Sequence, residues 1–317
     1  MPQPSEIFER VLPPRAVPAG LPMVVLMTGF TDAGGAVAGL INRFRDDGTA
    51  DVLGRFSNDV LLDYRARRPI VTFVRDHLTE YRPPRLELSL AHDVLGQQFL
   101  LLSGYEPDFA WEAFADVVLN LAAEHRVSGV TWVHAIGMPV PHTRPIGVTV
   151  SGNRDDLIAS LSVWQPETQV PATAGHLLEY RLAENGTSIA GLVLLVPHYL
   201  ADTEYPGAML VALEKMTAAT GLVFATDPIV EANRDFLVKV EEQIADNDEL
   251  QRMISALEVR YDAYRAGQFH EMERGEYTSE TLLDGAPLPS ADELAAELER
   301  FLANRPGDED KGAPGLG

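Results

Sequence analysis

A stretch near the middle of the chain, Val130–Arg154, places the strongest constraint on the fold. It begins with an apolar run rich in β-branched and aromatic residues, Val130–Ile136, which predicts a buried strand. A loop punctuated by glycine and proline, Gly137–Gly147, follows and carries His142 and Arg144. Ligands of α/β proteins bind beyond the carboxyl ends of strands, so we expect this loop to lie at such an edge.

Strand and helix signals alternate on both sides of this stretch. Leu21–Met27 is apolar and leads through a glycine-rich turn, Thr28–Gly35, into a helical pattern over residues 36–45. Ile189–Val196 is a second apolar run, followed by a helical pattern over residues 206–219. This alternation predicts an α/β fold with a mainly parallel or mixed sheet that is covered by helices on both faces.

The remaining patterns fill in this architecture. Four further strands are expected at Val52–Phe56, Ile70–Val74, Leu86–Ala91 and Phe99–Ser103, and further helices at Ala110–Glu124, Asp155–Leu161 and Thr173–Ala183. Asp108 is a candidate N-cap for the helix that begins near Ala110. Residues 1–20 are rich in proline and predict an irregular arm that lies on the surface or on a neighbouring subunit.

Three regions are expected along the chain: an α/β core (1–228), an acidic helical region (229–304) and a disordered tail (305–317). Within the second region, residues 235–265 predict two helices in a hairpin, because the apolar periodicity slips at Ala245–Asp248. A polar linker over residues 267–289 then leads to a capping box at Ser290–Glu293, which predicts a short amphipathic helix.

Composition excludes several classes of function. The net charge of −22 offers no basic surface for nucleic acid or for an anionic membrane. The chain has no cysteine, which excludes thiolate nucleophiles and cysteine-bound metals. No apolar run approaches the roughly 20 residues that span a bilayer, and no export signal begins the chain, so we expect a cytoplasmic location.

The candidate cleft combines four segments of the chain: Thr28–Gly35, His142–Arg144, Asn153-Arg154 and His198-Tyr199. The candidate binding residues are Thr28, Gly29, Asp32, Gly34, Gly35, His142, Arg144, Asn153, Arg154, His198 and Tyr199. An arginine can hold a carboxylate or phosphate, and a histidine titrates near neutral pH. We expect these segments to meet at one rim of the sheet. Asn153 and Arg154 follow a short extended run, Val148–Val150, and converge on the loop if this run and Val130–Ile136 are neighbouring strands.

Each of these residues also has a purely structural interpretation. Asp32 can cap the following helix, and Arg144 can pair with Asp32 or with a carboxylate of another subunit and so fix its loop. His134 lies inside an apolar strand and is expected to be a core or cleft histidine. The sequence shows no cofactor or metal motif and no nucleophile elbow, and therefore identifies no catalytic residue.

With these residues laid out, the chain resembles the bacterial, actinobacterial-type branch of the proteasome assembly chaperone 2 family, over about residues 15–304. The matching segments are Gly29-Phe30-Thr31-Asp32-Ala33-Gly34-Gly35, Gly137-Met138-Pro139-Val140-Pro141-His142-Thr143-Arg144-Pro145, Pro197-His198-Tyr199-Leu200 and Tyr205-Pro206. The resemblance implies a three-layer α/β/α sandwich similar to purine nucleoside phosphorylases, with an added C-terminal helical hairpin. It also implies that copies of the chain form a homo-oligomer, for which a homotrimer is one expected form.

Two functions remain open. Relatives in this family assist proteasome assembly by docking on α-subunits and have no enzymatic activity. The resemblance therefore implies that this chain is an oligomeric, non-enzymatic interaction protein. Its expected partners are its own copies, and proteasome subunits or another protein. Archaeal relatives dock through a tail ending in hydrophobic–Tyr–any residue, which Gly315-Leu316-Gly317 does not match. The alternative is a small-molecule-binding or phosphorylase/hydrolase-like protein with its cleft at the loops named above.

Overall fold

The computed structural model describes residues 3–11, 17–46, 48, 50–165 and 167–266. The strands are β1 (Phe8–Arg10), β2 (Pro22–Thr28), β3 (Asp51–Phe56), β4 (Ile70–Val74), β5 (His77–Arg82), β6 (Leu86–His92), β7 (Gln98–Tyr105), β8 (Gly129–Met138), β9 (Gly147–Gly152) and β10 (Ile189–Pro197). The α-helices are α1 (Pro4–Ile7), α2 (Ala36–Asp46), α3 (Asn58–Leu61), α4 (Trp111–His125), α5 (Asp155–Leu161), α6 (Ala174–Glu184), α7 (Pro206–Thr220), α8 (Asp227–Ala245) and α9 (Asp248–Arg265), and 3₁₀ turns lie at Ala33–Gly35 and His198–Leu200.

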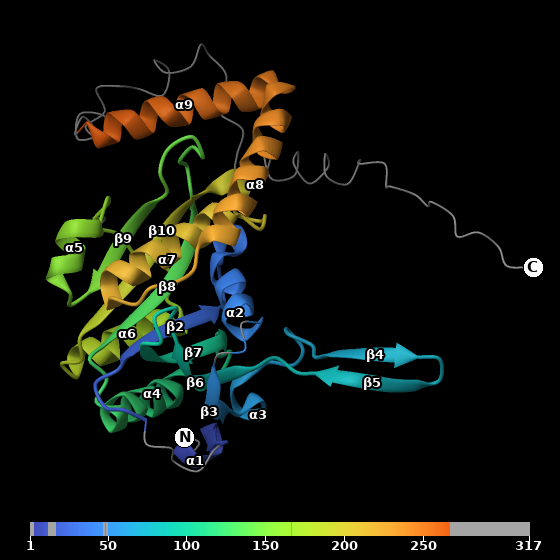
Figure 1. Cartoon of the computed structure of the whole chain (residues 1–317), viewed down its shortest axis with the longest axis vertical. Helices are drawn as coiled ribbons and strands as arrows, with labels where there is room; N and C mark the ends of the chain where they lie inside the picture. The colour runs from blue at the N-terminus through green and yellow to red at the C-terminus, as the bar shows by residue number, and fades with distance from the viewer. Residues whose placement is uncertain (1–2, 12–16, 47, 49, 166, 267–317) are drawn as a thin grey trace, which may run out of the picture. The chain divides into compact units, whose positions relative to one another are not determined.

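Eight of these strands form one mixed sheet in the order β1-β3-β6-β7-β2-β8-β10-β9 (Figure 1). At its centre β7, β2, β8 and β10 run parallel, while β6 and β9 run antiparallel to their neighbours β7 and β10. β3 shares the direction of the central strands, because it is antiparallel to β6. The mainly parallel sheet predicted from the alternation of strands and helices is confirmed.

The central strands are apolar on both faces because each face is covered by helices. Along β2, Val24 and Leu26 belong to one hydrophobic core, and Met23 and Val25 belong to the other. Side chains of α2, α7 and α8 complete the first core, and those of α4 and α6 complete the second. This arrangement confirms the three-layer α/β/α architecture.

The N-terminal segment differs from the expected surface arm. Ile7 is fully buried, and Phe8–Arg10 pairs with β3 as an edge strand of the sheet. The ring of Phe8 also packs on Phe56, with 4.9 Å between ring centroids. Proline content indicated an irregular segment. The buried Ile7, the contact of Phe8 with Phe56 and the pairing with β3 hold residues 7–10 on the sheet.

Asp108 does not cap α4 as expected. Its carboxylate accepts a hydrogen bond from the backbone N–H of Asp63 at 2.7 Å and pairs with Arg67. The residue in the N-cap position is Ala110, whose φ of 54° puts it in the left-handed region. The carboxylate of Asp108 therefore binds the arginine-rich loop after α3 and not, as the sequence pattern predicted, the start of α4.

Ile70–Val74 forms a strand, as predicted, but not in the main sheet. It pairs with β5 in a separate two-stranded ribbon, which Figure 1 shows extending away from the eight-stranded sheet. The register of the ribbon shifts between Ile70 and Thr72, and Glu80 on the partner strand has a φ of 53°, as expected for a β-bulge. Most side chains of the ribbon are exposed.

The two helices predicted over residues 235–265 are present as α8 and α9, which are separated by a break at Asp246-Asn247, while their packing as a hairpin remains a prediction. α8 packs on the first core through Ile229 and Val240, and Phe236 stacks on Tyr205 with 5.1 Å between ring centroids. The chain divides into compact units at 1–258 and 259–317, and only residues 259–266 of the second are described.

The predicted linker (267–289), the capped helix after Ser290 and the tail (305–317) lie outside the described residues. The expected division at residue 228 remains a prediction. No helix in the described ranges is long and apolar enough to cross a membrane.

Candidate functional site

The parallel strands bring the predicted loops to one edge of the sheet. β2, β8 and β10 end there, and each is followed by one of the segments singled out in the sequence. The glycine-rich turn docks on the segment after β10: the N–H of Gly34 donates to the carbonyl of Ala201 at 2.7 Å, and the N–H of Tyr205 donates to the carbonyl of Gly34 at 2.9 Å. Gly34 has a φ of 72°, which favours glycine.

Asp32 accepts hydrogen bonds from the start of α2. Its two carboxylate oxygens accept the backbone N–H groups of Val37 and Ala38, both at 2.8 Å, at the start of α2. Burial raises the pKa of this carboxyl, and the two hydrogen bonds act in the opposite direction. The structural interpretation of Asp32 therefore accounts for both of its oxygens.

His142, itself buried, is held in a partly buried chain of hydrogen bonds between the loop and α8. Its backbone N–H donates to the phenol oxygen of Tyr199 at 2.7 Å, and its ring Nδ1 lies 2.7 Å from the same oxygen. Its Nε2 lies 3.1 Å from a carboxylate oxygen of Glu241. The tautomer with the proton on Nε2 satisfies every contact, since Tyr199 then donates to Nδ1 and Nε2 donates to Glu241. Burial raises the pKa of Tyr199, which keeps the phenol protonated.

Arg144 and its neighbour Thr143 bind Glu258. The guanidinium lies 3.1 Å from a carboxylate oxygen of Glu258, and the hydroxyl of Thr143 donates to the same oxygen at 2.5 Å. Arg144 was expected to fix its loop by pairing with Asp32 or with a carboxylate of another subunit. Its partner in the structure is Glu258 of the same chain.

The structure does not bring Asn153 and Arg154 to this edge. β9 pairs with β10 rather than with β8 and runs antiparallel to it, so its end lies beside the beginning of β10. Asn153 there accepts the N–H of Ile189 at 2.8 Å, and Arg154 pairs with Asp156 at 2.6 Å. The predicted convergence required β8 and β9 to be neighbours, but β10 lies between them.

His198 is half enclosed at the end of β10. Its Nδ1 is buried without a hydrogen-bond partner. Burial lowers the pKa of this histidine, and a hydrogen bond to the backbone of Met138 partly offsets that effect. The ring is therefore neutral at pH 7.

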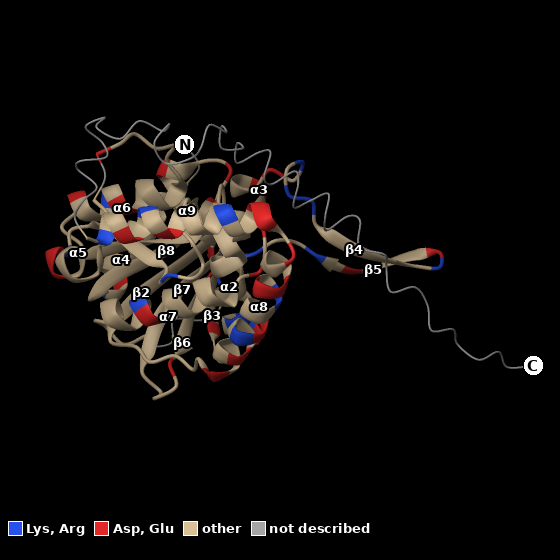
Figure 2. Ribbon diagram, turned by 90° about the horizontal axis from the view of Figure 1, so that it is seen from above, with Lys and Arg blue, Asp and Glu red and all other residues tan. Residues whose placement is uncertain are grey.

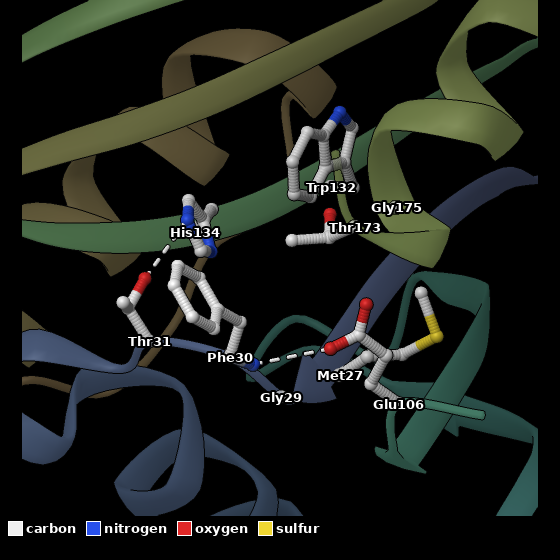
Figure 3. A pocket seen from close by; sticks show the side chains of 9 residues that line it. All are labelled: Met27, Gly29, Phe30, Thr31, Glu106, Trp132, His134, Thr173 and Gly175. Atoms are coloured by element: carbon white, nitrogen blue, oxygen red, sulfur yellow. Dashed lines mark hydrogen bonds between the residues drawn. The ribbon is translucent and has the colours of Figure 1, made fainter. Parts of the chain in front are cut away.

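A small pocket opens at the same edge, on the side of the sheet that α6 covers (Figure 3). Its volume is about 250 Å³, a figure that includes the open solvent at its mouth. Its lining residues are Met27, Gly29, Phe30, Thr31, Glu106, Trp132, His134, Thr173 and Gly175. Gly29 is the one predicted site residue among them, while His142, Tyr199 and Glu241 form a separate cluster.

Glu106 joins two walls of this pocket. One of its carboxylate oxygens accepts the N–H of Phe30 at 3.1 Å, and the other accepts the N–H of Ala174 at 2.6 Å. Gly29 is required beside it, because a Cβ there would lie 1.8 Å from the Glu106 carboxylate. The sequence pattern gave one usable signal for Glu106, namely its position directly after a buried strand at the binding edge.

Two histidines face each other across the pocket wall. The rings of His134 and His176 lie 6.0 Å apart, and both lie against Trp132. The Nε2 of His134 lies 3.2 Å from the hydroxyl of Thr31. Burial, reinforced by His176, lowers the pKa of His134 to about 4. The pocket therefore presents the neutral imidazole of His134, which suits hydrogen bonding better than proton abstraction at pH 7.

Among the described residues no group of three or more His, Asp or Glu side chains is placed to hold a metal ion. His134, His142 and His198 come from three loops or strands of this edge, but they have separate partners: Thr31, Tyr199 with Glu241, and Met138.

Comparison with known proteins identifies the family. A family model described as the PAC2 family matches residues 26–244, more than half of the chain. The chain belongs to the PAC2 family. The resemblance found from the loop motifs is thereby confirmed. A search of curated proteins finds no match.

Solved structures of actinobacterial proteins share the fold. A Mycobacterium tuberculosis protein of unknown function, Rv2714, is 35% identical, with a TM-score of 0.77 over 86% of this chain and 94% of that one. A Corynebacterium glutamicum protein of unknown function is 30% identical, with a TM-score of 0.76 over 86% and 100%. The M. tuberculosis proteasome-assembly chaperone homologue Rv2125 is 20% identical, with a TM-score of 0.67 over 74% and 100%, a likeness of fold.

The buried chain through Tyr199 predicts a measurable loss of stability. Tyr199→Phe removes the oxygen that accepts the His142 N–H and leaves that buried donor unpaired, so we expect unfolding to require about 1–3 kcal/mol less free energy. Urea unfolding followed by tryptophan fluorescence measures this difference. Tyr180→Phe is the matched control, because Tyr180 is 61% exposed, and it should change stability by less than about 0.5 kcal/mol. Equal effects of the two variants would contradict the burial of the Tyr199 contact.

The depressed pKa of His134 predicts a specific pH dependence. Between pH 6.5 and about 4 the unfolded chain binds a proton at this histidine and the folded chain does not. Stability contributed by His134 is therefore complete above pH 6.5 and declines as the pH falls toward 4. In ¹H–¹⁵N spectra the His134 ring should stay neutral at pH 5.5. A midpoint for this ring near 6.5 would contradict the assignment.

Proposed function

We propose that this PAC2-family protein is a cytoplasmic, oligomeric and non-enzymatic interaction protein with a chaperone-like role toward proteasome subunits. Two solved structures with the same fold support the proposal through their described roles. One is the proteasome-assembly chaperone homologue of M. tuberculosis, and the other is PbaB, an archaeal proteasome activator of Pyrococcus furiosus, with a TM-score of 0.56 at 14% identity.

The observation that carries this proposal is the engagement of the predicted cleft residues by their own chain. Asp32 binds the start of α2, His142 binds Tyr199 and Glu241, and Arg144 binds Glu258. Polar groups with partners of this kind hold loops in place. An edge held in this way suits a protein that presents a surface.

The acidic face of α8 is the surface we assign to the proteasome contact. Glu231, Asp235 and Glu242 are exposed on this helix, and such carboxylates favour a partner with basic residues. Charged groups at the rim of an interface act mainly on the association rate, which makes the contact sensitive to salt.

Reconstitution with purified proteasome α- and β-subunits tests the proposal. We expect micromolar binding to α-subunits and faster formation of the 20S particle on native gels. The variant E231K/D235K/E242K should weaken binding about tenfold or more, and Glu214→Lys, at an equally exposed position on α7, should leave it unchanged. Wild-type protein that neither binds nor changes the assembly rate would overturn the proposal.

A second candidate is small-molecule binding, and the pocket at Glu106 favours it. Trp132 and Phe30 offer aromatic surface there, and the hydroxyls of Thr31 and Thr173 together with His134 offer hydrogen-bonding groups. The volume of about 250 Å³ includes open solvent at the mouth and lies below the roughly 300–1,000 Å³ of most ligand sites, so the pocket would accept one small group of a larger molecule.

A thermal-shift screen with phosphate, nucleosides and sugar phosphates tests this second candidate. A ligand at about 100 times its Kd should add about 2.7 kcal/mol to the free energy of unfolding. Gly29→Ala should abolish that gain, because a Cβ at this position displaces Glu106 from the pocket wall. The matched control is Gly129→Ala, where φ is not positive and a Cβ would lie 3.5 Å from the nearest atom, an ordinary contact. A screen without any shift would remove this candidate.

A further inference from the structure

The pocket at Glu106 holds a formal negative charge that no basic side chain offsets. Glu106 is 7% exposed, and its carboxylate is the one formally charged group among the residues that line the pocket. Its partners are the backbone N–H groups of Phe30 and Ala174, which stabilise the charge without neutralising it. Within the described ranges, arginines pair with other carboxylates, such as Glu112 and Glu258, and none pairs with Glu106. Buried glutamates are rarely left without an ion pair, so this pocket favours a cation from outside the chain.

A second carboxylate lies behind the aromatic wall of the pocket. One oxygen of Glu179 accepts the indole N–H of Trp132 at 2.5 Å and the hydroxyl of Ser151 at 2.8 Å. Both donors are neutral. Burial lowers the pKa of His176, and the charges of Glu179 and Glu106 both act on it in the opposite direction. The wall of the pocket therefore lies in the field of two carboxylates.

The remaining lining groups suit an ammonium group better than an anion. Phe30 and Trp132 present aromatic surface, and the faces of aromatic rings attract cations (Figure 3). The hydroxyls of Thr31 and Thr173 can accept hydrogen bonds, and a carboxylate has about four acceptor positions, of which the two backbone N–H groups use two. Burial lowers the pKa of His134 to about 4, so this ring adds no positive charge at pH 7.

The charge of the whole chain favours the same kind of ligand. Acidic residues outnumber lysine and arginine by 47 to 25, and Figure 2 shows acidic residues on several helices, α5 and α8 among them. A net charge of −22 attracts cations toward the protein and repels anions. Phosphates and carboxylates are therefore disfavoured both at the surface and inside the pocket.

We propose that the pocket binds a primary ammonium group at the end of an unbranched alkyl chain. A free alkylamine and a lysine side chain of a protein partner share this chemistry. The volume of about 250 Å³, open solvent included, fits one such group and leaves the rest of the molecule outside. Phe30 is 71% exposed and offers apolar surface to the alkyl chain. The inference rests on the pocket of the second candidate function and names its ligand class, and it does not depend on the proteasome contact.

NMR titration of the full-length chain tests the site, with the indole ¹H–¹⁵N signal of Trp132 as the readout. Butylammonium chloride should shift this signal. Butanol, which lacks the charge, and sodium butyrate, which is repelled, should not shift it at the same concentration and ionic strength. So small a ligand binds weakly, and we expect a Kd of about 1–10 mM. The signals of Trp111 and Trp164, which do not line the pocket, are the internal references.

Variants that remove one charge test the two carboxylates. Glu106→Gln should weaken butylammonium binding about tenfold or more, because a charge-assisted hydrogen bond is lost. Glu179→Gln keeps an acceptor for Trp132 and should weaken binding severalfold, and it decides the question if Glu106→Gln does not fold. The matched control is Glu184→Gln on α6, where the side chain is 51% exposed, and it should leave the Kd unchanged. A wild type that does not bind butylammonium, equal shifts with butanol, or an unchanged Kd in the folded carboxylate variants would overturn the proposal.

A lysine peptide distinguishes the two sources of the ammonium group. If acetyl-Gly-Lys-Gly-amide binds at least as tightly as butylammonium, the ligand is a lysine side chain of a partner, and binding of the free amine alone indicates a small molecule. The same peptide with norleucine in place of lysine is the control, and equal binding of the two peptides would contradict the ammonium site. Shifts with nucleosides or sugar phosphates but not with butylammonium would keep the second candidate function and overturn this ligand class. Amine binding by a protein that does not bind proteasome subunits would contradict the main proposed function alone.

Discussion

The parallel pairing of β8 with β2 on one side and β10 on the other determines the rest of the molecule. Val24 lies beside Thr131, and Leu192 lies beside Val133, so all three strands start together, and β8 and β10 run a little past the end of β2. Their apolar side chains alternate between two buried layers, which requires helices on both faces. The same pairing forces the loops after the three strands to meet at one edge. The hydrogen bonds of Gly34 with Ala201 and of His142 with Tyr199 follow from that meeting.

The sequence predicted the parts of the fold that follow from continuous apolar runs. β2, β8 and β10 are such runs, and their burial on both faces is what produces the pattern. β5 was missed, because its side chains are mostly polar and the bulge at Glu80 breaks the alternation. The placement of β4 outside the main sheet depends on that missed strand. Local pattern does not tell which strand will be a neighbour.

The candidate site was predicted less completely, because its contacts join residues far apart in the chain. His142 and Glu241 are separated by 99 residues, and nothing near either residue identifies the other. The position of Arg154 depended on whether β9 pairs with β8 or with β10, and short runs do not decide this. The cap formed by Asp32 was accessible to sequence reasoning, since its partners lie five and six residues further on. A binding role for these residues remains a prediction.

Glu106 has a mechanical consequence for the pocket beside it. Since one carboxylate holds both the turn after β2 and the first residue of α6, these two walls cannot separate without breaking one of its hydrogen bonds. Breaking it would leave a buried oxygen facing an enlarged opening without a donor, which costs free energy. Widening is therefore resisted, and an occupant must either fit the existing space or supply a donor group that replaces a lost N–H. The two hydrogen bonds of Glu106 therefore select ligands by size and by hydrogen-bonding character.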